Sequence, residues 1–344
     1  MSRPWFFSPA PRLSGLDVLS LSCWYGANAS IQKVLDTIRR FNGDLRQHDF
    51  SIGKGGSCYD PRTTTFGTYQ DFVALANRYK PRLIHLHFNS LVPFKRSDMD
   101  YDVKVVQTVH AIARTVFRNE CDAVVCIHEA GRAAQAGLPD RRKIQVIYNN
   151  VSIASEVDAE KLEAGSPVFV CRTSAEDFNE TTARVLAACV IPPKKVAVIG
   201  YSKSNPYAGE FRAIARRYRK SLRLKRWTTD MEKVYRRAAF LIETSPRDPT
   251  EASFDLSVQE AVGMGLPVVV RRREQTRTMI VEDGVNGFIC DSDEEIIAGC
   301  RQLQGDPDLL RRFSENAKLR FRKALSGRPM AEEYRALYDR LWER

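Results

Sequence analysis

The chain has 344 residues, of which 43% are apolar, and a formal net charge of +11. This length and apolar content allow two α/β domains of ordinary size, each with its own core. No stretch approaches the roughly 20 apolar residues of a membrane-spanning helix, and the proline-containing N-terminus does not look like a signal peptide. We therefore expect a cytoplasmic protein. The positive charge favours anionic partners, such as phosphates, DNA or the acidic inner face of a membrane to which the protein would bind peripherally. General solubility is the other explanation of the charge.

Eight cysteines are spread along the chain without a CxxC pair. Several lie in apolar runs, such as "AVVCIH" (123–128) and "VFVCR" (168–172). In a reducing compartment such residues pack as small core side chains. The His and Cys spacings of a zinc site are missing, so we expect no bound metal.

Short apolar runs alternate with helical patterns from one end of the chain to the other. Residues 29–41 and 69–79 are typical of amphipathic helices. The runs are typical of strands buried on both faces of a parallel sheet, and they cover residues 16–22, 81–87, 103–109, 122–127, 143–148, 167–171, 195–200, 238–243 and 266–270. The repeated order of strand and helix predicts an α/β protein with two doubly wound, Rossmann-like sheets.

The boundary between the two sheets is predicted in the acidic, small-residue segment 152–166. The first domain would then cover residues 1–151 and the second residues 152–328. The final segment, 329–344, has apolar residues at helical spacing, and no strand follows it. We expect it to form a helix that packs back on the first domain.

Glu260 follows the turn "FDLS", at the expected start of a helix. Ligands of open α/β sheets bind beyond the carboxyl ends of the strands, where helix N-termini offer free N–H groups to phosphate. Ser257 to Glu260 also match a capping box, in which Glu260 would only bond to its own helix start. On local grounds both interpretations remain open.

The segments around Glu260 carry a family resemblance. "QEAVGMGLPVV" (259–269) and "MIVEDGVNGFI" (279–289) resemble two consecutive motifs of the retaining family 4 glycosyltransferases, which have the GT-B fold. Weaker similarities extend over most of the chain: "PRLIHLH" (81–87), "VVQTVHAIARTVFRN" (105–119), "KIQVIYNNV" (143–151) and "PVFVCRTS" (167–174).

The resemblance implies two Rossmann-like domains facing each other across a cleft, with the nucleotide sugar bound by the second domain. It implies transfer of the sugar to a hydroxyl, with retention, and without a metal or a resident cofactor. The donor would be a UDP- or GDP-sugar, and the first choice of acceptor is a glycan or a lipid-linked glycan. Neither the exact sugar nor the oligomeric state follows from the sequence.

The resemblance also assigns residues to the donor site. Glu260 takes the place of the second glutamate of an E-x7-E motif, which binds the ribose. Arg172 takes the place of the arginine that neutralises the diphosphate, a role that suits a forked, permanently charged guanidinium. The backbone N–H groups expected at the diphosphate and sugar belong to Phe254, Asp255 and Leu256.

Three positions depart from the family pattern. Ala252 stands where the first glutamate belongs, and Glu251 can serve in its place only if the loop is one residue longer. The family's second cation would fall near Phe178, so we expect Lys203 to supply that charge from another loop. Asp255 replaces a glycine and adds negative charge close to the expected phosphate.

In the first domain, Gly26 opens the expected acceptor-side loop, although a simple strand-to-helix turn explains it equally well. His110 ends a strand and matches a histidine that contacts the sugar, so we assign it a positioning role. The other strand-end histidines, namely His85, His87 and His128, are weaker candidates for which core packing is the default. Residues 51–67 are interpreted as a mobile polar loop on the acceptor side, and 211–227 as a basic, solvated helix that could instead contact an anion.

Two other functions remain open. One is sugar transfer to DNA bases, as in viral enzymes with this fold, which the positive charge allows. The other is a non-catalytic, GT-B-like binding protein, which the departures at Ala252, Phe178 and Asp255 motivate.

Overall fold

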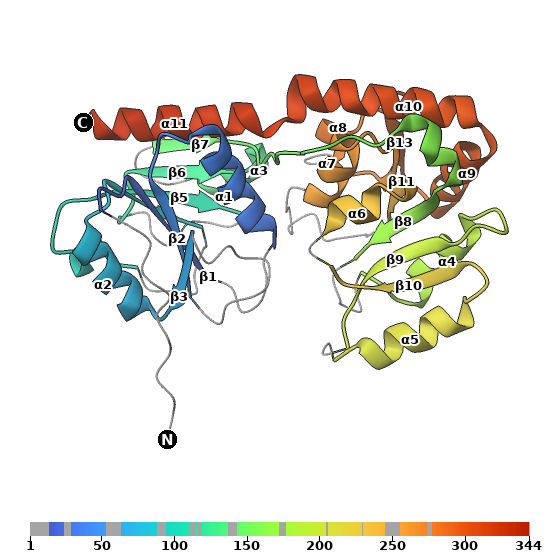
Figure 1. Ribbon diagram of the computed structural model, residues 1–344, viewed down its shortest axis with the longest axis horizontal. Helices are drawn as coiled ribbons and strands as arrows, with labels where there is room; N and C mark the ends of the chain where they lie inside the picture. Colours follow the sequence, from blue (N-terminus) through green and yellow to red (C-terminus); the bar gives the residue numbers. More distant parts are fainter. Residues whose placement is uncertain are drawn as a thin grey trace. The chain divides into compact units, whose positions relative to one another are not determined.

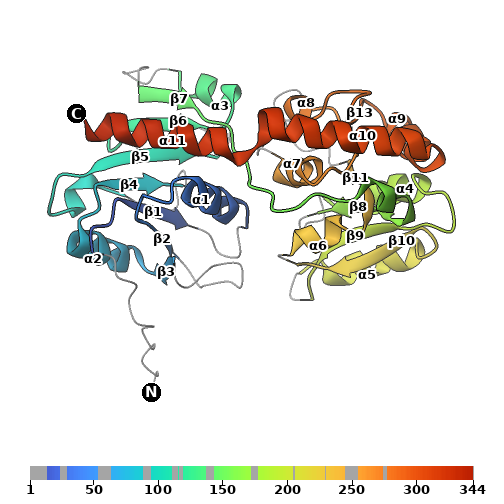
Figure 2. The ribbon, with the colours of Figure 1, turned by 45° about the horizontal axis from the view of Figure 1, so that its top comes forward.

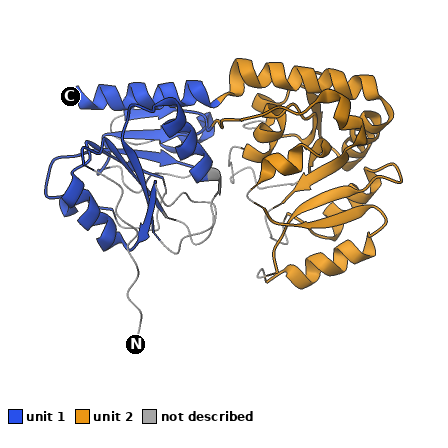
Figure 3. Ribbon diagram, viewed as in Figure 1, with its two compact units in different colours: residues 1–149, 327–344 blue, residues 150–326 orange. Residues whose placement is uncertain are grey.

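The chain consists of two compact units, one built from residues 1–149 and 327–344 and the other from residues 150–326 (Figure 3). The structure is a computed structural model. It describes residues 14–23, 29–52, 63–87, 94–110, 115, 119–136, 143–171, 177–203, 206–228, 230–244, 255–273 and 277–343.

The described part of the first unit contains a seven-stranded sheet (Figure 1). Every pairing between its described strands is parallel. In sheet order the strands are β3 (Thr64–Gly67), β2 (Gln47–Ile52), β1 (Val18–Cys23), β4 (Leu83–Leu86), β5 (Lys104–Val109), β6 (Ala123–Cys126) and β7 (Ile144–Val146). The strand order reverses between β1 and β4, which is where doubly wound sheets bind their ligands.

Helices cover both faces of this sheet, because alternate residues of the strands point to opposite sides. They are α1 (Ala29–Phe41), α2 (Tyr69–Tyr79), α3 (Glu129–Ala134), the 3₁₀ turn η1 (Arg96–Asp98) and α11 (Gly327–Trp342). Phe72 of α2 packs in the same core cluster as Leu19 and Leu21 of β1. Val18 of the same strand packs in the opposite cluster with α1 and α11.

The C-terminal helix α11 belongs to the first unit although it comes last in the chain (Figure 2). Its apolar face packs into the cluster of Val18 and Val34 through Met330, Tyr334, Leu337, Tyr338 and Leu341. The Tyr338 hydroxyl lies 2.7 Å from His85 Nδ1, and the Tyr334 hydroxyl lies 3.0 Å from Thr108 Oγ1. The helix is therefore held by both apolar packing and buried hydrogen bonds.

The second unit, in its described residues, contains a six-stranded sheet whose described pairings are also all parallel. In sheet order the strands are β10 (Leu222–Arg226), β9 (Val196–Tyr201), β8 (Ser166–Val170), β11 (Ala238–Glu243), β12 (Val268–Arg271) and β13 (Gly287–Cys290). Its helices are η3 (Ala159–Ala164), α4 (Glu180–Ala188), α5 (Ala208–Arg217), α6 (Met231–Tyr235), α7 (Leu256–Gly263), α8 (Arg277–Ile280), α9 (Asp293–Gly305), α10 (Pro307–Arg320) and the π-helical turn η4 (Phe321–Leu325).

The nine apolar runs of the sequence all form strands, so the predicted fold of two doubly wound parallel sheets is confirmed. Three of the other strands correct the sequence interpretation of two segments. Residues 211–227 are not one helix, because α5 ends at Arg217 and residues 222–226 form the edge strand β10. Residues 51–67 are not one loop, because β2 continues to Ile52 and residues 64–67 form β3.

Candidate functional site

Helix α7 begins directly after Asp255, on the carboxyl side of strand β11. Its first internal hydrogen bond runs from the Gln259 N–H to the Asp255 oxygen, at 3.0 Å. The N–H groups of the first turn therefore have no acceptor within the helix, and the positive end of the helix dipole lies with them. Such a helix start can bind a phosphate group.

The capping-box interpretation of Glu260 is wrong. The residue that caps α7 is Asp255, and its side chain makes no capping hydrogen bond, whereas Ser257 lies inside the first turn. Glu260 therefore lies in the second turn and cannot close a box with Ser257. Helix capping therefore does not explain the position of the Glu260 carboxyl group.

Glu260 is buried and faces a tyrosine of the preceding helix. Only 6% of Glu260 is exposed, and its carboxyl group is hydrogen-bonded to the Tyr235 hydroxyl. The same hydroxyl lies 3.1 Å from the backbone oxygen of Ser257, so its single proton is shared between these two acceptors. Burial, followed by the charges of Glu260 and Glu243, raises the pKa of Tyr235 well above its ordinary value, so Tyr235 stays a neutral donor. Tyr235 thus fixes the position of Glu260.

Asp255 is held by two arginines. Its carboxylate lies 2.8 Å from Arg277 Nε and 3.7 Å from Arg273 Nη1. Arg277 is 1% exposed, and it also lies 3.5 Å from Glu243, at the end of β11, and donates to the backbone oxygen of Arg271 at 2.8 Å. The negative charge that replaces the family's glycine is therefore neutralised by neighbours. Arg277 also ties the start of α7 to the ends of β11 and β12.

Several predicted donor-site residues lie outside the described residues, namely Arg172, Glu251, Ala252 and Phe254. Lys203 is described and exposed, two residues after β9 ends. Leu256, like Asp255, is buried, at 8% exposure, and it begins α7. Phe178, which stands where the family has a lysine, is fully buried and packs on Phe211, with ring centroids 5.0 Å apart. That position therefore belongs to the core in this chain.

Three histidines of the first unit lie together at the ends of β4 and β5. The ring centroids of His85 and His87 are 3.9 Å apart, and His87 Nδ1 lies 3.2 Å from His110 Nε2. His85 is completely buried between Tyr338 and Thr108, at 2.7 and 2.8 Å, so it is a core residue. Burial lowers the pKa of His85 to about 3 and that of His110 to about 4.

His110 is half-buried, and both of its ring nitrogens have partners. The amide nitrogen of Asn149 lies 3.3 Å from Nδ1, which therefore accepts, so Nε2 carries the proton and donates to His87. His110 is consequently neutral near pH 7 and suited to hydrogen bonding rather than to carrying charge. His128 is different: its Nδ1 accepts the N–H of Gly131 at 2.8 Å and caps α3. Gly26 lies outside the described part of the chain.

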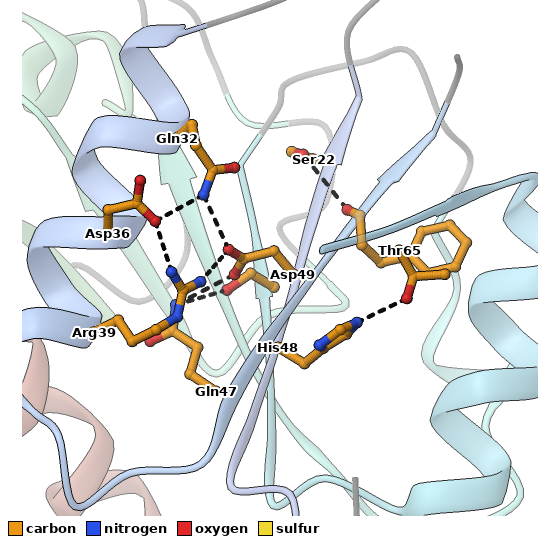
Figure 4. A network of polar contacts seen from close by, with 10 residues as sticks. Ser22, Gln32, Asp36, Arg39, Gln47, His48, Asp49 and Thr65 are labelled. Carbon is orange, nitrogen blue, oxygen red and sulfur yellow. Dashed lines mark hydrogen bonds and ion pairs between the residues drawn. The ribbon is translucent and has the colours of Figure 1, made fainter. Parts of the chain in front are cut away.

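A second polar cluster lies beneath α1, and the sequence analysis missed it (Figure 4). Asp49 of β2 is buried and pairs with Arg39 of α1, which also bonds to Asp36 at 2.6 Å. Gln32 donates to Asp36 at 2.9 Å and lies 3.4 Å from Asp49. Burial raises the pKa of Asp49, against the opposing effect of Arg39. Each of the four side chains contacts two of the others, so the cluster ties α1 to the sheet.

Two other kinds of site are absent from the described residues. Among the described residues, no helix is long and apolar enough to cross a membrane. The same residues contain no group of three or more His, Cys, Asp or Glu side chains that could hold a metal ion.

Residues 168–306, within the second unit, match the family model "Glycosyl transferases group 1". No curated protein matches the chain.

Solved structures match nearly the whole chain. Anabaena HepE in complex with UDP-glucose is 16% identical, with a TM-score of 0.74, and the match covers 94% of this chain and 99% of HepE. Sucrose-phosphate synthase from Thermosynechococcus elongatus is 12% identical, with a TM-score of 0.69 and coverages of 95% and 99%. AviGT4, a glycosyltransferase involved in avilamycin A biosynthesis, is 18% identical, with a TM-score of 0.66 and coverages of 95% and 98%.

These neighbours show that the chain has the GT-B fold that its sequence predicts. The helix that carries Glu260 lies within the residues that match the glycosyl transferases group 1 model. The comparisons therefore give the GT-B fold for nearly the whole chain and a glycosyl transferases group 1 match for residues 168–306.

Proposed function

We propose that the protein transfers a sugar from a nucleotide sugar to a hydroxyl group, with retention at the anomeric carbon. The observation that carries the proposal is the start of α7. An open helix N-terminus lies beside a buried carboxylate that Tyr235 orients. The helix N-terminus can bind a phosphate, and the carboxylate can accept hydrogen bonds from ribose hydroxyls.

In the proposed donor complex, the first N–H groups of α7 bind the diphosphate, and Glu260 accepts hydrogen bonds from the ribose. Arg172 and Lys203 add positive charge at the leaving diphosphate. These cations and the helix dipole would carry the charge without a metal ion. UDP-sugars are the first donors to test, because structures of Anabaena HepE contain UDP, UDP with glucose, and UDP-glucose. GDP-sugars follow, because the sequence resemblance implies either nucleotide.

His110 is proposed to orient the transferred sugar. Since both of its ring nitrogens are bonded within the first unit, a sugar hydroxyl must replace either Asn149 or His87 as a partner. Its lowered pKa makes it a poor cation near pH 7, which suits an orienting role. The acceptor is proposed to be a glycan or a lipid-linked glycan.

The direct test is a panel of UDP- and GDP-sugars assayed for nucleotide release with glycan and lipid-linked acceptors. We expect one donor class to be turned over by the wild type and much less by the Glu260→Gln variant. The absence of turnover and of nucleotide binding across the panel would contradict the proposal and favour a binding protein. Transfer to duplex DNA alone would favour the DNA-modifying alternative.

A further inference from the structure

One short segment accounts for most of the net positive charge of the protein. Residues 212–226 contain eight basic residues and no acidic residue, whereas the whole chain has a net charge of +11. The other 329 residues therefore contribute a net charge of only +3. The eight are Arg212, Arg216, Arg217, Arg219, Lys220, Arg223, Lys225 and Arg226, and we call them the basic face.

The fold exposes this segment in two elements that contact each other. Helix α5 buries Phe211 and Ile214, so Arg212 and Arg216 turn to solvent. Strand β10 is the edge of its sheet and pairs only with β9 among the described strands. Its basic residues Arg223, Lys225 and Arg226 are exposed, and α5 packs against it (Figure 1).

Acidic neighbours neutralise little of this charge. Arg217 pairs with Glu180 at 2.8 Å, and none of the other seven makes an ion pair with a described residue. Like charges held this close repel one another and attract an external polyanion. Lysine often protects an edge strand against pairing with another chain, but such protection does not require a basic helix beside the strand.

Exposed aromatic residues flank the basic face. Trp227 follows β10 directly and is 43% exposed, and Tyr207 immediately precedes α5 and is 45% exposed. The Trp227 N–H donates to the backbone oxygen of Tyr201 at 2.8 Å, which fixes the backbone beside the strand end. Tryptophan and tyrosine are the side chains that favour the boundary between water and a lipid bilayer.

We propose that the basic face, with Trp227 and Tyr207 at its ends, binds the anionic headgroups of a membrane surface. Clustered Lys and Arg residues attract acidic lipids, and aromatic side chains add the second contribution that reversible binding needs. The proposal does not depend on the identity of the donor or acceptor. It would place the second unit at a surface where lipid-linked acceptors are found.

The test is co-sedimentation of the whole protein with vesicles of neutral phosphatidylcholine, with or without added phosphatidylglycerol. The wild type should bind only the anionic vesicles and should be released by salt, because exposed charges are screened. The triple variant Arg223→Gln, Lys225→Gln, Arg226→Gln should bind at least about tenfold more weakly. The matched control, Arg40→Gln, Arg237→Gln, Lys323→Gln, removes the same charge elsewhere and should bind like the wild type.

A second readout reports on the aromatic end of the basic face. Lipids with brominated chains should quench fluorescence in the wild type, and the quenching should largely disappear in the Trp227→Phe variant. Equal losses in the control and the test triple would overturn the proposal, as would equal binding to neutral vesicles. It would also fail if the test triple lost affinity for duplex DNA but not for anionic vesicles. Unchanged melting temperatures would show that each variant is folded.

Discussion

The guanidinium of Arg277 lies 2.8 Å from the carboxylate of Asp255, and both side chains are almost completely buried at the start of α7. Replacing Arg277 by methionine should leave a buried carboxylate without its main partner, and it should cost about 3–5 kcal/mol in the free energy of unfolding. The double variant Asp255→Gly, Arg277→Met removes both charges of the pair and should recover part of that loss, because Glu243 still lacks Arg277. Chemical denaturation of the wild type, the two single variants and the double variant measures the coupling between Asp255 and Arg277.

The same variants should separate nucleotide binding from stability. Since the pair sets the start of α7, Arg277→Met should weaken binding of UDP more than binding of uridine. The matched control is Arg39→Met in the first unit, which also breaks a buried pair, with Asp49. It should lower stability without changing the ratio of the two affinities. A double variant no more stable than Arg277→Met would show that the pair is not a compensating one.

Glu260 and Tyr235 provide the second prediction. Glu260→Gln keeps the size of the side chain but weakens its hydrogen bonds to ribose, so nucleotide-sugar binding should fall by about 1.5–3 kcal/mol. Tyr235→Phe removes the hydroxyl that orients Glu260, and it should lower affinity in the same direction by a smaller amount. Calorimetry with UDP and with inorganic diphosphate distinguishes the two parts of the site, since only UDP carries the ribose. An equal loss for both ligands would assign Glu260 to the phosphate side or to folding.

Strands with continuous apolar sequence could be predicted, and the strands that were missed have a physical explanation. "AAFLIE" forms β11 with the predicted bounds, because every residue of the run is buried. Strand β10 has the sequence LRLKR, and as an edge strand it turns its charges to solvent, which hides the apolar signal. Strand β2, with the sequence QHDFSI, buries His48 and Asp49, whose partners Thr65 and Arg39 come from β3 and α1.

The candidate site was predictable where a motif is local, and not where it depends on tertiary contacts. The start of α7 and Glu260 follow from sequence order alone. The partnership of Asp255 with Arg277 spans 22 residues, and nothing in the local pattern of either segment indicates it. For the same reason, the sequence alone could not distinguish a capping box between Ser257 and Glu260 from a ligand-binding role for Glu260. The structure shows that α7 starts two residues earlier than that box requires.

The buried histidines predict how folding depends on pH. Burial lowers the pKa of His85 to about 3, whereas an unfolded histidine titrates near pH 6.5. Between these values only the unfolded chain binds the proton, so the stabilisation is complete above pH 6.5 and is lost as the pH falls toward 3. In this pH range, each such histidine lowers the free energy of unfolding by about 1.4 kcal/mol for every pH unit that the pH falls.

Proton uptake on unfolding measures this directly. At about pH 5, His85→Gln should take up nearly one proton fewer than the wild type when it is unfolded by denaturant. His85 has Tyr338, Thr108 and the other two clustered histidines around it, so the variant should also be less stable at neutral pH. Equal proton uptake in both proteins would mean that His85 is already protonated in the folded state.

His110 gives the final prediction, which separates a residue that orients the sugar from one that only packs. If His110 orients the transferred sugar, His110→Ala should lower kcat by roughly 10- to 1000-fold, the scale of lost positioning in an active site. UDP affinity should remain close to that of the wild type, because UDP lacks the sugar that His110 would contact.

The matched control is His128→Ala, which removes the cap on the Gly131 N–H and should lower the melting temperature without changing turnover by the folded enzyme. Asn149→Ala frees His110 Nδ1 and should retain most activity if a sugar hydroxyl normally takes that place. Wild-type turnover in a folded His110→Ala protein would show that His110 is only a core residue, like His85. The sugar contact would then have to be sought elsewhere in the first unit.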